Sequence, residues 1–145
     1  MKKCLIYIYL LLLTSLYCLQ AGAVSSEIRS LSVSDGLPDL VINTIYKDSK
    51  GYVWMGTNTS VERFDGIRLE HYMVEGSNEN LKRVFALVEM PGNELWVGTG
   101  MGLFRLADDA EKLERLASEM ITSGVHAFCK LGDVLYVGTE KGLFL

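Results

Sequence analysis

The chain has 145 residues, with 18 acidic and 14 basic side chains and a formal net charge of −4. This acidic balance argues against a nucleic-acid partner, because proteins that bind a phosphate backbone carry a basic face.

Residues 1–23 have the pattern of a secretory signal peptide. Two lysines precede an apolar stretch, and a small-x-small pattern at residues 21–23 follows it. The stretch is shorter than the roughly 20 residues that a membrane span needs, so we expect removal rather than anchoring. Lipidation at Cys18 is the alternative. The sequence therefore predicts an exported protein whose mature chain begins at Val24.

Residues 24–40 read as a lead-in to the part that follows. Residues 28–31 precede the first repeated unit much as an extended segment precedes each later unit. We therefore expect an orphan outer strand here. In a ring of blades such a strand can complete the last blade.

A short phrase occurs three times in the rest of the chain, each time as an aromatic residue, one further residue and then Gly-Thr. Copies recur about every 40 residues, which is the size of one β-propeller blade. The repeated positions are Trp54, Gly56 and Thr57, then Trp96, Gly98 and Thr99, then Tyr136, Gly138 and Thr139.

Each copy lies within a series of β-branched and aromatic runs separated by turn residues. We name the four expected strands of a unit A to D, from the axis outward. The pattern predicts an all-β fold: a partial β-propeller of about two and a half four-stranded blades, an incomplete ring. The blades cover about residues 41–74, 83–117 and 125–145, and the third is truncated. An amphipathic helix over residues 106–121 is the alternative to an outer strand there.

The shared position of the aromatic residues favours packing between blades over stacking on a sugar. The glycine that follows each of them suits a close approach of another backbone.

Several other motifs lack the context that their chemistry needs. The glycine-rich residues 98–102 resemble a phosphate loop, but a strand follows them where a nucleotide site needs a helix. His71 and His126 have no partners at metal-ligand spacing, and Cys129 reads as a small buried side chain. The acidic residues 108–111 read as a solvated loop. No catalytic constellation, cofactor site or metal site is expected in this part of the protein.

Four segments of the first unit together resemble the two-component regulator propeller repeat, and residues 31–37 are similar to the opening of the periplasmic sensor of bacterial hybrid two-component systems. The four segments are residues 42–45, 48–51, 54–57 and 63–66. The unit departs from the family at Ser60 and Val61, where Gly-Leu is favoured, and the third unit has Tyr136 in place of Trp.

The resemblance implies a ligand-sensing propeller of a hybrid sensor histidine kinase. Its parent would be periplasmic and anchored in the inner membrane, and its usual ligands would be glycan fragments that control transcription. Partners would be the remaining propeller blades and, in the full sensor, a second copy in a homodimer. Any enzymatic activity would lie outside this part. Two alternatives stay open: a piece of an exported propeller enzyme, such as a lyase or glycosidase, and a structural propeller for protein contacts.

Strand alternation places the D-to-A and B-to-C connections on one rim of the propeller and the other turns on the opposite rim. The first set of loops is longer and more varied, and binding sites are usually built on such loops. The polar residues expected to contact a ligand on this rim are Asp35, Asp39, Asn58, Asn78 and Asn80.

Overall fold

The structure, a computed structural model, describes residues 28–74, 81–116 and 121–145. Within these ranges it confirms the all-β prediction: strands dominate, and the helical part is a 3₁₀ turn, η1 (Val33–Asp35). The strands are β1 (Thr44–Lys47), β2 (Val53–Gly56), β3 (Val61–Phe64), β4 (Leu69–Tyr72), β5 (Val84–Met90), β6 (Glu94–Thr99), β7 (Gly102–Leu106), β8 (Glu114–Arg115), β9 (Val125–Leu131), β10 (Val134–Thr139) and β11 (Gly142–Phe144).

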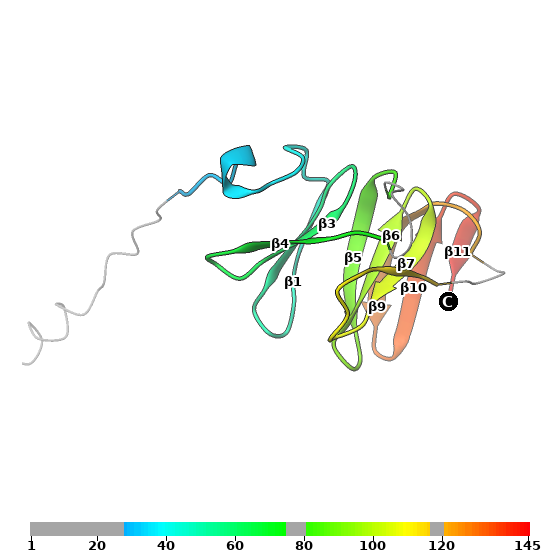
Figure 1. Cartoon of the computed structure of the whole chain (residues 1–145). Coiled ribbons are helices and arrows are strands. Elements are labelled where there is room, and N and C mark those ends of the chain that lie inside the picture. Colours follow the sequence, from blue (N-terminus) through cyan, green and yellow to red (C-terminus); the bar gives the residue numbers. More distant parts are fainter. Residues whose placement is uncertain (1–27, 75–80, 117–120) are drawn as a thin grey trace, which may run out of the picture. The chain divides into compact units, whose positions relative to one another are not determined.

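The strands form three antiparallel sheets in which each strand pairs with its neighbours in sequence. The orders are β1-β2-β3-β4, β5-β6-β7-β8 and β9-β10-β11. Figure 1 shows the three sheets following one another along the chain, as blades of a propeller do. We call them blades 1, 2 and 3. Within the described residues, blade 3 has three strands.

Two apolar clusters join the blades. The first lies between blades 1 and 2 and is built from Trp54, Val61, Tyr72, Leu81, Val84, Leu87, Leu95, Val97, Phe104, Leu106 and Leu113. The second joins blades 2 and 3 through Leu103, Val125 and Val137, with Trp96 and Phe144 packed against them. Burying these side chains removes apolar surface that a single blade would leave in water, so each blade depends on its neighbour.

The glycine after each repeated aromatic residue sits where the next blade approaches. A Cβ on Gly56 would lie 2.5 Å from Cγ1 of Val84, and one on Gly98 would lie 2.8 Å from Cγ1 of Val125. Both distances are well inside van der Waals contact. The inner strand of the following blade therefore requires glycine at these two positions.

Residues 28–31, expected to form an orphan outer strand, pair with no described strand, and the blade that such a strand would complete is not among the described sheets. The alternative of a helix over residues 106–121 is wrong for the described part of that range: Leu106 ends β7, and residues 107–116 form a loop and the short strand β8. In the described part of the chain, no helix is long and apolar enough to cross a membrane. The signal peptide predicted at residues 1–23 lies outside the described residues.

Cys129 is free and exposed rather than buried, which corrects a further expectation. It lies opposite Tyr136 on the face of blade 3 that points away from blade 2. Among the described residues no further blade covers that face.

Candidate ligand-binding rim

The repeated threonine closes the B-to-C turn of every blade. Oγ1 of Thr99 donates to the carbonyl oxygen of Gly102 at 3.0 Å and accepts the N–H of Met101 at 3.0 Å. Thr139 and Thr57 make the corresponding pairs of bonds in the other two blades. The threonine of the Gly-Thr motif thus stabilises the turn, because its hydroxyl bonds to a backbone carbonyl and a backbone N–H that the turn leaves unpaired.

Asn58, one of the expected ligand residues, lies in the closed turn of blade 1. Its Oδ1 accepts Nδ2 of Asn43 at 3.2 Å and Nε of Arg83 at 3.3 Å. Its backbone carbonyl accepts the N–H of Arg83 at 2.8 Å. The connection from blade 1 to blade 2 therefore fixes this turn. No hydrogen bond among the described residues uses the Nη groups of Arg83, which are donors in a planar fork.

Arg83 and the preceding Lys82 both have left-handed backbone conformations, with φ of 71° and 48°. Such values are uncommon for residues other than glycine and persist where surrounding bonds impose them. Here the imposing bonds are those from Asn58 to Arg83 and from the N–H of Gly100 to the carbonyl of Arg83. Both basic side chains are exposed on the rim.

Of the other residues expected to contact a ligand, Asp39 lies near Asn58 and Asp35 belongs to η1. Oδ1 of Asp39 accepts the N–H of Val41 at 2.9 Å, and this bond, aided by hydrogen bonds from Asn58, holds the pKa of the Asp39 carboxyl below its usual value. Asp39 and Asn58 are therefore close together. Asp35 instead caps η1, where its Oδ2 accepts the N–H and Oγ of Ser32, each at 2.9 Å. Asn78 and Asn80 lie outside the described residues.

Three residues at matching positions of the inner strands extend this rim from blade to blade. Asn43, Phe85 and His126 each stand one residue before the strand position that pairs with the repeated glycine. At Phe85 and His126 the ladder is bulged, which turns a side chain out of the regular alternation. Their rings lie 4.3 Å apart between centroids. Nε2 of His126 also lies 3.4 Å from Oε1 of Glu140.

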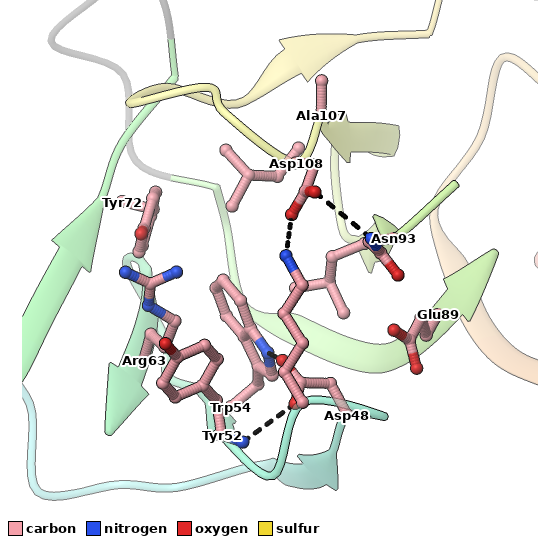
Figure 2. A pocket seen from close by; sticks show the side chains of 12 residues that line it. Asp48, Tyr52, Trp54, Arg63, Tyr72, Glu89, Asn93, Ala107 and Asp108 are labelled. Atoms are coloured by element: carbon pink, nitrogen blue, oxygen red, sulfur yellow. Dashed lines mark hydrogen bonds and ion pairs between the residues drawn. The ribbon is translucent and has the colours of Figure 1, made fainter. Parts of the chain in front are cut away.

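The opposite rim holds a second polar group of residues, drawn in Figure 2. Asp48 accepts the N–H of Tyr52 at 2.8 Å and Nε1 of Trp54 at 2.7 Å, so the turn and the repeated indole are tied to one carboxylate. The guanidinium of Arg63 lies 4.6 Å from the ring centroid of Tyr52. Desolvation raises the pKa of Tyr72 to about 12, and a hydrogen bond to Glu70 adds to the shift.

Bonds between blades also cross this opposite rim. Lys50 forms an ion pair with Asp108, and Oγ of Ser49 donates to Glu89 at 2.6 Å. These bonds from residues 49 and 50 of blade 1 to Glu89 and Asp108 of blade 2 hold the two blades together at the opposite rim.

Comparison with known proteins finds similarity to a propeller repeat and to extracellular domains of known structure. Residues 36–59 match the two-component regulator propeller family. Two solved structures of the extracellular domain of BT4673 from B. thetaiotaomicron are similar to it: one is described as a putative one component system, the other as a putative hybrid two component system.

The two alignments differ little. Both have 26% sequence identity, with TM-scores of 0.61 and 0.63. They cover 71% and 74% of this chain but 14% of the BT4673 chain, so the chain spans about one seventh of that propeller protein. No curated protein matches the chain.

Sequence reasoning placed Asp39 and Asn58 on the propeller rim but missed Asn43, Arg83, Phe85 and His126 as their neighbours. One signal was available. Asn43, Phe85 and His126 hold the same position of the repeat, directly after a β-branched residue at the start of each inner strand. Arg83 gave no such signal, because its contact with Asn58 depends on a left-handed backbone at a residue that is not glycine.

Proposed function

We propose that the chain is part of an extracytoplasmic ligand-sensing propeller of a two-component signal transduction protein, and that the ligand is an oligosaccharide. The observation that carries the proposal is the propeller repeat itself, in blades similar to the extracellular domain of BT4673. The parent would be a periplasmic sensor histidine kinase anchored in the inner membrane, with the homodimer as its signalling form. This part would bind ligand without catalysing a reaction.

The rim residues supply chemistry that suits a sugar. Amide, guanidinium and carboxylate groups can each donate or accept hydrogen bonds to paired hydroxyls. Asp39, Asn58 and Arg83 bring all three kinds together, and Phe85 adds an aromatic ring beneath the guanidinium at 5.9 Å. The mutual hydrogen bonds hold the groups in place before any ligand arrives, which lowers the entropy cost of binding.

Calorimetric titration of the complete sensor with its cognate oligosaccharide tests the proposal. We expect Asp39→Ala, Asn58→Ala and Asn80→Ala each to weaken binding, by about tenfold or more for a residue that loses a buried hydrogen bond to ligand. Asn93→Ala is the matched control, since Asn93 is an exposed amide of the opposite rim that contacts Asp108. Unchanged affinity in all three rim variants would remove the site from these loops.

A further inference from the structure

Blade 1 differs from the other two blades at linked positions. Glu62 pairs with Met55 in the register where Phe104 pairs with Val97 and Phe144 pairs with Val137. A carboxylate therefore stands where two blades have a phenyl ring. Two residues earlier, Ser60 takes the place that glycine holds in the later blades.

These two departures contact each other. Oε1 of Glu62 accepts Oγ of Ser60 at 2.7 Å, and Nδ1 of His71 lies 2.7 Å from the same oxygen. The side chain of Glu62 is fully buried, while that of His71 is 41% exposed. Oε2 of Glu62 is buried with no hydrogen-bond partner among the described residues. An ionised carboxylate only accepts hydrogen bonds, so Nδ1 of His71 donates to it.

The chain of bonds continues into the turn that carries Asn58. Oγ of Ser60 lies 3.1 Å from Oγ1 of Thr57, and that hydroxyl accepts the N–H groups of Thr59 and Ser60 at 3.1 and 3.0 Å. His71, on the outer strand β4, is thus connected through Glu62 and the hydroxyl of Ser60 to the β2–β3 turn at residues 57–60, because Ser60 belongs to that turn and its N–H donates to Oγ1 of Thr57. The corresponding turn of blade 2 is closed by Thr99 and continues to no acid, because Phe104 replaces the glutamate.

The buried carboxyl group of Glu62 makes this series of hydrogen bonds sensitive to protonation. Burial raises the pKa of the Glu62 carboxyl, against the hydrogen bonds from Ser60 and His71 and the positive charge of His71. Strand alternation points the neighbouring charges, Arg63 and Glu70, to the other face of the sheet. On the Glu62 face β1 and β2 present Ile45 and Met55. His71 is therefore the charged partner of Glu62 among the described residues.

We propose that His71, Glu62 and Ser60 form a proton-linked clamp on the β2–β3 turn. With His71 protonated, the buried carboxylate has a counter-charge and stays bonded to Ser60, and the turn is held. When His71 loses its proton, the carboxylate is left charged in a low-dielectric site and must bind a proton or move toward water. Either change weakens the bond to Ser60, and the turn loosens.

The clamp deepens the proposed function, because it would make the display of Asn58 to ligand depend on pH. That consequence rests on the proposed function. The clamp itself does not, since it concerns the mobility of a turn with no ligand present. Glu62 and His71 act here as positioning residues.

Hydrogen exchange measured by mass spectrometry on the full-length protein, from pH 5 to pH 8, tests the clamp. After correction for the intrinsic pH dependence of exchange, we expect protection of the Thr59 and Ser60 amides to fall about tenfold across the titration of one group. The Thr99 turn of blade 2 serves as an internal control and should keep constant protection. If amide protection in the blade 1 turn changes with pH as little as in the blade 2 turn, the proposal is overturned.

Variants assign the effect to its residues. His71→Gln cannot be protonated, and Glu62→Gln cannot be charged, so each should abolish the pH step. The double substitution Ser60→Gly with Glu62→Phe restores the residues of the other blades and should also give a flat profile. Glu70→Gln, an exposed carboxylate one residue from His71 that pairs with Arg63, should keep the step. A step that persists in His71→Gln would contradict the clamp. A step in the native protein together with pH-independent ligand affinity supports the clamp and separates Asn58 from ligand contact.

Discussion

At the scale of single residues, Asp48 ties a turn of blade 1 to a core side chain, whereas blades 2 and 3 have Met90 and Lys130 at the corresponding position, six residues before the aromatic residue. One oxygen holds the backbone of the turn and the other holds the indole N–H of Trp54, whose ring is 5% exposed between two blades. In blade 2 the corresponding indole makes a weaker contact: Nε1 of Trp96 donates to Glu94 at 3.4 Å. The carboxylate thus sets both the turn and the orientation of a core side chain.

Asp48→Ala should therefore destabilise the protein. Hydrogen bonds to a charged acceptor contribute about 1.5–3 kcal/mol each, and solvent at this half-buried turn replaces part of that, so we expect a loss of about 2–3 kcal/mol. Urea unfolding of the full-length protein measures it. Asp133→Ala, in the exposed β9–β10 turn, is the control and should change stability by less than about 0.5 kcal/mol. Equal effects of the two substitutions would show that the bonds of Asp48 contribute little.

Individual contacts were the part of the site that sequence could not predict. Glu62 reads as one polar residue in a strand, and its partner His71 stands nine positions later. They meet because β3 and β4 pair in the register that places them side by side. Register follows from turn lengths and from the buried faces together, so pairing of this kind becomes visible only when all four strands are placed.

At the scale of strands and turns, the positions of most strands could be predicted from the sequence repeat. Three copies of one short motif indicated where the inner hairpins lie, and the structure has strands at these positions. The outer elements were less certain for a physical reason: an outer strand is held by one neighbour only. Accordingly β8 has two residues, and residues 28–31, with no neighbour among the described strands, remain outside any sheet.

The Gly-Thr turns allow a matched comparison between blades. Thr99 is fully buried, and Thr99→Val, which keeps its shape, leaves the N–H of Met101 and the carbonyl of Gly102 without their partner. An unsatisfied buried polar group costs about 1–3 kcal/mol, so we expect a loss in that range. Thr139 makes the same two bonds on an exposed turn, where water can replace the hydroxyl. Thr139→Val should cost about 0.5 kcal/mol or less, as read from urea midpoints. Similar losses at both sites would argue that the hydroxyl bonds do not stabilise these turns.

At the scale of the whole molecule, blades 1 to 3 form an open series, and the face of blade 3 away from blade 2 is apolar. Leu131 is 70% exposed and Leu143 66% exposed, and Val134, which pairs with Leu131, is on the same face. In the first two blades the corresponding face is covered by the next blade. Repeat proteins are stabilised largely by such contacts between neighbours, so an uncovered face costs stability and promotes association.

Residues 24–145 produced alone should therefore bind a hydrophobic dye and self-associate in a concentration-dependent way. Leu143→Lys places a charge on the apolar face of blade 3 and should reduce both the dye signal and the association measured by sedimentation. Ile67→Lys is the matched control: Ile67 is 82% exposed, but it lies in the β3–β4 turn, away from any face that a blade would cover. It should leave both signals unchanged, since association through this face is specific to the surface on which a further blade would pack. A monomer that melts in one sharp transition and binds no dye would show that these blades are stable without a further neighbour.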